Sequence, residues 1–139
     1  MVARASSEQA HAFEERPIIY QRGDCVYLDG WVFPDVADDR GFLRAGKIVE
    51  WMEVVGVVAA TRYCRFPVVT SVDGIVFRDR IRVGEHVTMS ALVTHTSERS
   101  TGVSISMTCA GTEVEHPRSV LKAYMSFERC KGKAAVPGQ

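Results

Sequence analysis

The sequence predicts an α+β fold in which an antiparallel sheet of five or six strands wraps around one long central helix. Residues 48–60 are apolar on nearly every side of a helix, and such a helix must be buried. Residues 86–96 and 103–109 alternate apolar and polar residues, as half-buried strands do. Because most of the strand-like segments follow the helix in a row, they favour an antiparallel sheet that covers it.

The predicted elements follow one another with clear boundaries. Residues 24–33 form a β-prone run that Pro34 ends, and a polar loop leads from this run to the helix. After the helix, Phe66 and Pro67 break the pattern. The short polar loop 97–100 predicts a hairpin. The strands after the helix are rich in β-branched residues or alternate in polarity: residues 68–77, 86–96, 103–109 and 121–127.

Length and composition predict one domain. A chain of 139 residues can bury a core without disulfides, and residues 17–130 carry the periodic apolar content. Residues 1–16 and 131–139 have little of it, and we expect them to be flexible tails. Because Lys and Arg balance Asp and Glu, we expect no general attraction to nucleic acid or to a membrane.

The cysteines are scattered through the chain, at Cys25, Cys64, Cys109 and Cys130. No C-x-x-C pair occurs and no His stands at the spacing of a zinc ligand, so we expect no metal site. Reduced thiols, together with a first segment that lacks an apolar run, predict a cytoplasmic protein without a secretory signal.

Glu53 is the first candidate for a functional residue, because it lies in the middle of the apolar helix. We expect it to lie in or beside the core. Burial disfavours the ionised form of a carboxylate unless it is paired or hydrogen-bonded, and such a group can act as a base or nucleophile near neutral pH. An alternative stays open, because Glu50 and Glu53 share one helical face that could be a solvated strip.

A series of short segments stands in a fixed order: residues 41–46 (GFLRAG), 51–53 (WME), 62–64 (RYC), 69–73 (VTSVD), Phe77 and 81–84 (IRVG). The series resembles the motifs of the hot-dog fold acyl-CoA thioesterases, in the group with a G-x-V-H-G-G motif and an acidic residue on the central helix. Several matched motifs in order are a specific signal. The resemblance implies a hot-dog fold and hydrolysis of an acyl thioester to a free acid and CoA, or a carrier-protein thiol. It implies no cofactor beyond the coenzyme A of the substrate.

Several positions depart from the family motifs. Arg44 and Ala45 stand where the family has His and Gly, and Glu53 stands where it has a catalytic Asp. Phe42 occupies a position at which some family domains carry a catalytic Asn. The resemblance therefore implies that Arg44 and Ala45 are substrate-binding positions. It implies that Glu53 activates water or attacks the carbonyl itself.

The start of the helix suits the oxyanion of a thioester reaction. Unpaired N–H groups and the positive end of the helix dipole lie near Ala45 and Gly46, and Gly46 lets a carbonyl approach closely. An ordinary turn into the helix is the alternative. Gly46 and Glu53 are about 10 Å apart along the axis, too far for both to act on one carbonyl. We therefore expect Gly46 of one subunit to act with Glu53 of another, in a homodimer or a higher homo-oligomer such as a tetramer or hexamer.

Arginines and hydroxyl residues supply the remaining candidates. Arg78, Arg80 and Arg82 alternate before a strand, and guanidinium groups suit the phosphates of coenzyme A. A solvated turn balanced by Asp79 is the alternative. Thr70 and Ser100 could support the substrate, or each could be a hydroxyl of a strand surface.

Two other functions stay open beside thioester hydrolysis. A hot-dog dehydratase needs a His that acts with an acidic residue, and Arg44 stands where that His would be. A non-catalytic acyl-thioester binder or scaffold would keep the fold without the reaction. The expected partner is an acyl-CoA or acyl-carrier-protein thioester, with no nucleic acid and no membrane.

Overall fold

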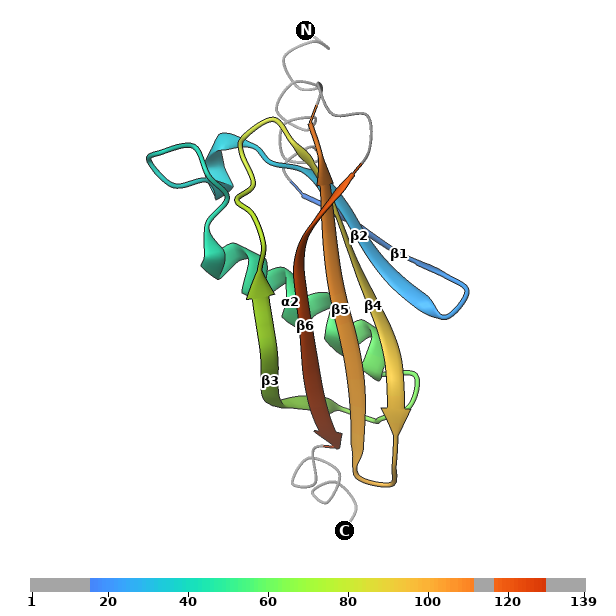
Figure 1. The fold of residues 1–139 in the computed structure, drawn as a ribbon. Coiled ribbons are helices and arrows are strands. Elements are labelled where there is room, and N and C mark those ends of the chain that lie inside the picture. The colour runs from blue at the N-terminus through green and yellow to red at the C-terminus, as the bar shows by residue number, and fades with distance from the viewer. Residues whose placement is uncertain (1–15, 112–116, 130–139) are drawn as a thin grey trace, which may run out of the picture.

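The computed structural model describes residues 16–111 and 117–129. Within these ranges the chain forms one sheet, one α-helix and a short 3-10 turn (Figure 1). The helix α2 spans Ala45–Ala60, and the turn η1 spans Pro34–Val36. The strands are β1 (Ile18–Arg22), β2 (Cys25–Trp31), β3 (Pro67–Phe77), β4 (His86–Thr96), β5 (Ser100–Ala110) and β6 (Arg118–Arg129).

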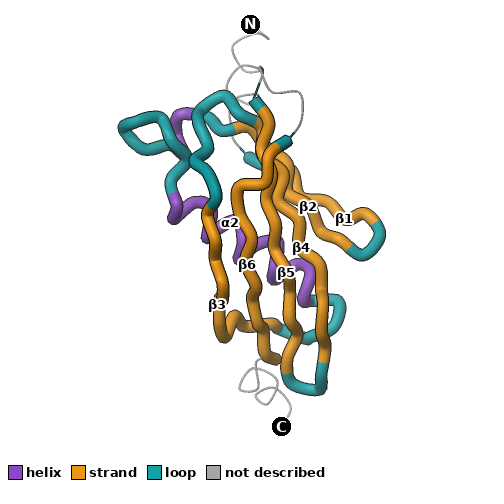
Figure 2. The backbone as a smooth tube through the Cα atoms, in the orientation of Figure 1, coloured by secondary structure: helices purple, strands orange, loops and turns teal. Residues whose placement is uncertain are grey.

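The six strands lie in the order β1-β2-β4-β5-β6-β3, and every neighbouring pair is antiparallel. Because β3 pairs with β6 and not with β2, the chain crosses one face of the sheet between β2 and β3. Figure 2 shows α2 making this crossing behind the strands. The predicted architecture, a sheet of five or six strands around one long helix, is confirmed. The edges of the sheet are β1 and β3.

One stripe of α2 packs against the sheet and forms the core with it. Gly56 permits this close approach, because a Cβ added there would lie 2.7 Å from Cζ of Phe127. The buried positions of the helix recur at helical spacing and include Ile48, Met52, Val55 and Ala59. The buried residues of β5 alternate as the sequence predicts, at Val103, Ile105, Met107 and Cys109.

One element differs from the sequence prediction. The sequence does not predict β1, because Ile18 and Ile19 are both exposed and give no alternation of polarity. The strand depends instead on its turn at Gly23, whose φ is +62°, and on pairing with β2. The helix begins at Ala45, near the start that the sequence analysis predicts, and its first residues, Ala45 and Gly46, are exposed.

No helix in the described part of the chain is long and apolar enough to cross a membrane. Among residues 16–111 and 117–129, no group of three or more His, Cys, Asp or Glu could hold a metal ion. Cys25, Cys64 and Cys109 are free thiols. Cys130, residues 1–15 and residues 130–139, which include nearly all of the two predicted tails, lie outside the described residues.

Candidate active site

Two loops meet beside the first turn of α2. Residues 37–44 lead into the helix, and residues 78–85 lead from β3 to β4; both lie at the same end of the sheet (Figure 2). The N–H of Leu43 donates to the Ile81 carbonyl at 2.8 Å, and the N–H of Val83 donates to the Gly41 carbonyl at 3.0 Å. These bonds hold the two loops together.

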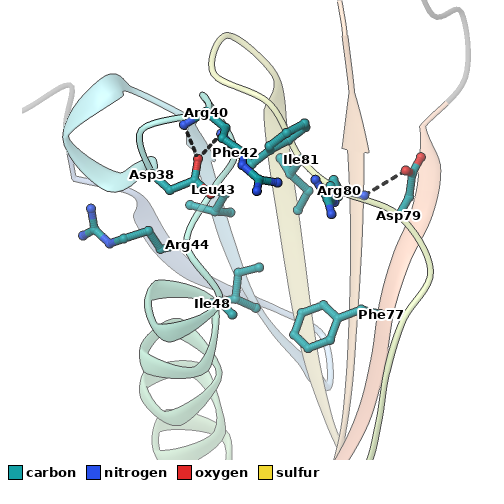
Figure 3. A pocket seen from close by; sticks show the side chains of 11 residues that line it. Asp38, Arg40, Phe42, Leu43, Arg44, Ile48, Phe77, Asp79, Arg80 and Ile81 are labelled. Carbon is teal, nitrogen blue, oxygen red and sulfur yellow. Dashed lines mark hydrogen bonds between the residues drawn. The ribbon is translucent and has the colours of Figure 1, made fainter.

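A cleft of about 300 Å³ opens between these loops and the helix, and we call it the helix-start cleft. Figure 3 shows Ile48 of α2 and Phe77 of β3 facing each other in it, below Leu43 and Ile81. Ala45 also lines it. The cleft is therefore an apolar slot at the first residues of the helix, and charged residues line the rest of it: Asp38, Arg40, Arg44, Asp79 and Arg80.

The first amides of α2 are available for a ligand. Ala45 and Gly46 are the first helical residues, whose N–H groups have no partner within a helix, and no side chain caps them. Gly46 is exposed, and no heavy atom lies within 4 Å of a Cβ built on it. The space beside the Gly46 Cα is therefore open, and the positive end of the helix dipole lies at these amides.

Arg44 also lines this cleft, but its guanidinium is bonded to the backbone beside it. Its Nη1 donates to the carbonyls of Asp35, at 3.1 Å, and Ala37, at 3.2 Å. In Figure 3 its side chain points away from Phe77 and Ile81. In the single chain, Arg44 therefore ties η1 to the loop before the helix.

A second cleft, of about 630 Å³, shares Phe42, Phe77, Asp79 and Arg80 with the first, and we call it the arginine cleft. Three of its walls are Arg78, Arg80 and Arg82, so the structure brings together the arginines that the sequence singles out. The guanidinium carbons of Arg80 and Arg82 lie 4.9 Å and 5.3 Å from the centroid of the Phe42 ring. Within the described residues none of these three arginines forms a salt bridge, which leaves their charges for an anionic ligand.

Asp79 pairs with Arg118 of β6, so it is only partly available to offset those charges. Arg118 Nε donates to Asp79 Oδ2 at 2.8 Å, and Arg118 Nη1 donates to Glu85 Oε2 at 2.8 Å. Arg118 holds the pKa of Glu85 below its usual value. The N–H of Arg80, followed by Arg118, does the same for the pKa of Asp79.

The sequence analysis misses Arg118, Glu85 and the role of Phe42 as a shared wall. Arg118 and Glu85 belong to different strand ends, far apart in the chain, and no local spacing relates them. The only sequence signal for these residues is the arginine-rich turn itself, because its positive charges need carboxylate partners elsewhere in the fold.

The prediction that Glu53 lies in or beside the core is wrong for the single chain. Glu53 is exposed, because the sheet covers only one stripe of α2 and leaves the opposite face open. Exposed apolar side chains share that open face: Val49 is 42% exposed, and Val54 and Val58 are each 38% exposed. The apolar residues on every side of the helix thus predict that the whole helix is buried, but the sheet of one chain buries only one side of it.

Thr70 and Ser100 lie at the far end of the sheet from the arginine cleft. Ser100 stands opposite Glu128 and Arg118 opposite Cys109 in the β5–β6 ladder, so the two ends are roughly 30 Å apart along β6. Thr70 Oγ1 donates to the Ser126 carbonyl at 3.2 Å, where a register shift interrupts β3. Ser100 is bonded to Ser97 in the β4–β5 turn. Within one chain neither hydroxyl faces a cleft described above.

Comparison with known proteins places this site within a family. The family described as "Thioesterase superfamily" matches residues 41–116, which include the end of the first loop, the whole of α2 and the whole of the second loop. The chain is 39% identical over 81 residues to the acetyl-coenzyme A thioesterase of Rattus norvegicus, covering 58% of this chain and 15% of that protein. It is 32% identical over 93 residues to the cytosolic acyl coenzyme A thioester hydrolase of Homo sapiens, covering 66% and 24%. The chain thus spans less than a quarter of the length of either relative.

A solved structure supports the fold. The hexameric thioesterase y2039 from Yersinia pestis has a TM-score of 0.69 to this chain at 21% identity. The match covers 79% of this chain and 89% of that one. At this level of identity the likeness shows the fold alone, and it confirms the hot-dog architecture that the motifs imply.

Proposed function

The chain belongs to the thioesterase superfamily, and from this membership we propose that it hydrolyses an acyl-CoA to a free acid and CoA. Two of its relatives are named as coenzyme A thioester hydrolases, which supports this substrate class. An acyl-carrier-protein thioester is the other substrate of the same chemistry. The reaction needs no cofactor, because a thioester is already activated for acyl transfer.

One observation carries the proposal: the uncapped first amides of the helix and three arginines that form no salt bridge with the described residues lie at two clefts that share Phe42 and Phe77. The N–H groups of Ala45 and Gly46 are suited to the oxyanion that forms on the thioester carbonyl. Arg78, Arg80 and Arg82 are suited to the phosphates of coenzyme A. The apolar helix-start cleft between them can take the uncharged part of the substrate.

In this proposal, Glu53 either activates the water that attacks the thioester carbonyl or attacks the carbonyl itself. Its carboxylate takes a proton from a water whose oxygen adds to the carbonyl carbon, and the tetrahedral oxyanion then expels the CoA thiolate. Direct attack by the carboxylate is the other route, in which an acyl-enzyme anhydride forms and water then cleaves it. Both routes consume one water and release one acid and one thiol.

A second copy of the chain completes the site in this proposal. Glu53 and Gly46 of one helix are about 10 Å apart, so Glu53 serves the amides of a neighbouring subunit. The exposed valines around Glu53 provide an apolar surface for that subunit, which would also remove water from the carboxylate. A homodimer or a higher assembly follows, and the related thioesterase from Yersinia pestis is named as hexameric. A cytoplasmic location is part of the same proposal.

A non-catalytic acyl-thioester binder is the second candidate function. It is favoured by Phe42 and Arg44, because neither the ring nor the guanidinium, which is bonded to Asp35 and Ala37, offers catalysis at the helix start. A dehydratase has less support. His86 and His95 both lie on β4, and His86 packs edge-on against Trp31.

Thiol release from a panel of acyl-CoAs tests the proposal. Stoichiometric release of CoA and free acid is the expected result. Loss of water from a 3-hydroxyacyl-CoA would instead indicate a dehydratase. Binding of acyl-CoA without any turnover, in a folded and assembled protein, would contradict hydrolysis and support the binder.

A further inference from the structure

Arg118 lines the arginine cleft, but its guanidinium donates four hydrogen bonds to the protein itself. Besides its bonds to Asp79 and to Glu85 Oε2, its Nη2 donates to Glu85 Oε1 at 3.1 Å and to the Arg80 carbonyl at 2.9 Å. A guanidinium has five N–H donors, and four hydrogen bonds are made here. Two carboxylates offset its single charge. These hydrogen bonds suit Arg118 to the task of holding a protein loop in place.

Arg118 holds residues 78–85, the loop that carries Arg78, Arg80 and Arg82. Glu85 Oε1 accepts the N–H of Arg82 at 2.7 Å, and the Arg82 carbonyl accepts the N–H of Glu85 at 3.1 Å. The Glu85 carboxylate therefore closes the turn from inside while Arg118 anchors the carboxylate to β6. The same loop is bonded to residues 41–43, which lead to the amides of Ala45 and Gly46.

We propose that Arg118 is a positioning residue, which acts through Glu85 and Asp79 to hold residues 78–85 so that Arg80 and Arg82 stand against Phe42 and face the phosphates of a coenzyme A ligand. This inference rests on the proposed function, because it names how the phosphate-binding part of that site is shaped. It assigns to Arg118 a task different from that of Arg78, Arg80 and Arg82.

Glu85→Gln separates positioning from simple electrostatics by the sign of its effect. The substitution removes a negative charge near a site for anions, so electrostatics alone would tighten the binding of CoA. Positioning predicts the opposite, because an amide cannot accept the paired N–H bonds of Arg118 and also close the turn at Arg82. We expect the Kd for CoA, titrated into the full chain by calorimetry, to rise about 5-fold or more. Glu128→Gln, at the far end of β6, is the matched control and should leave it unchanged.

Arg118→Lys provides the second test. Lysine keeps the charge but lacks the fork that joins Asp79, Glu85 and the Arg80 carbonyl. A direct phosphate contact would survive this change in large part, whereas positioning predicts that Arg118→Lys weakens CoA binding as much as Arg118→Gln does. Arg129→Lys, an exposed arginine at the other end of the same strand, is the control.

Hydrogen exchange and turnover complete the experiment. Amides of residues 78–85 should exchange faster in Glu85→Gln and Arg118→Lys than in the controls, with circular dichroism unchanged. Unchanged exchange, equal or tighter CoA binding in Glu85→Gln, or wild-type binding in Arg118→Lys would overturn the inference. Failure of the wild type to release thiol while it binds CoA would contradict hydrolysis alone and leave the positioning role in force.

Discussion

The two regions of α2 that the proposed reaction uses are built in different ways. At the start of the helix, one chain supplies the amides, the apolar slot and the arginines, and hydrogen bonds within that chain hold both loops in place. In the middle of the helix, Glu53 stands on an open face among exposed valines, and the described part of the chain offers it no salt bridge or hydrogen bond.

In the proposed function, this difference assigns binding and catalysis to different levels of structure. We expect the part of the site that recognises the thiol carrier to form when one chain folds. We expect the part that activates water to form only when a second chain covers the open face, because a carboxylate in bulk water is a weak base. The predictions below test this division, beginning with the largest expected effect.

The largest effect should come from Glu53→Gln. The substitution keeps the size of the side chain and removes the base, so we expect kcat to fall by about 10² to 10⁴ while KM stays within a few-fold. Steady-state rates of thiol release on the best acyl-CoA measure this. Glu50→Gln is the control, because Glu50 is exposed one turn earlier and pairs with Lys47 at 2.6 Å. Activity of Glu53→Gln near that of the wild type would move catalysis to another residue.

Two inactive variants should restore each other if the site is shared between subunits. Gly46→Val fits the single chain, since nothing lies within 4 Å of its Cβ, so its loss of activity would report on the substrate or the partner. In a mixed dimer of Glu53→Gln and Gly46→Val, one site carries both defects and the other is whole. Random pairing makes about half the dimers mixed, so about a quarter of wild-type activity should return after joint refolding.

The rescue experiment has a clear negative outcome. Mass spectrometry of the intact assembly must show that mixed dimers have formed. If they have formed and no activity returns, the site lies within one subunit or Gly46 has no such role. The division between a self-complete binding region and a shared catalytic region would then be wrong.

The sequence predicts the fold well, because the periodic burial of helix and strands is a local property. The strands 86–96 and 103–109 and the helix are found where alternation and apolar content place them. The sequence does not predict β1, because the apolar residues of this strand face solvent and the strand depends on pairing with β2. The error at Glu53 has a related cause, since apolar pattern predicts that a face will be covered but not which chain will cover it.

The sequence predicts the site less completely, because much of it depends on contacts between distant segments. Arg78, Arg80 and Arg82 are close in sequence, and their gathering follows from a single turn. The bonds from Arg118 to Glu85, and the stacking of two arginines on Phe42, join separate elements that only the folded sheet brings together. The shared role of Glu53 and Gly46 rests on the family motifs together with their spacing along the helix.

The arginines should affect binding more than turnover. Each of Arg78→Ala, Arg80→Ala and Arg82→Ala should raise KM by up to about 10-fold, with little change in kcat, because the phosphate contact is equal in ground and transition states. The salt dependence of KM should also become weaker. Arg99→Ala, in the β4–β5 turn, is the matched control. If KM and its salt dependence stayed the same in all three, these residues would belong to the solvated surface.

The smallest effect concerns stability and pH in the region that one chain completes. Because Arg118 lowers the pKa of Glu85 in the folded state, the ionised carboxylate stabilises the fold at pH values above its unfolded pKa, near 4.5. That contribution is lost as the pH falls through the lower, folded pKa. Glu85→Gln should therefore melt a few degrees below the wild type at pH 7, for a loss of about 1 kcal/mol, and the difference should shrink below about pH 4.

Melting curves from pH 3 to pH 8 at a fixed protein concentration test this dependence, because assembly also shifts the melting temperature. Glu128→Gln should match the wild type throughout, since Glu128 is exposed and forms no salt bridge within the described residues. A constant difference between Glu85→Gln and wild type at all pH values would show that side-chain packing, and not the ion pair with Arg118, explains the loss. A difference that grew on acidification would contradict the lowered pKa of Glu85. It would also mean that the ion pair between Arg118 and Glu85 does not stabilise the arginine cleft within one chain.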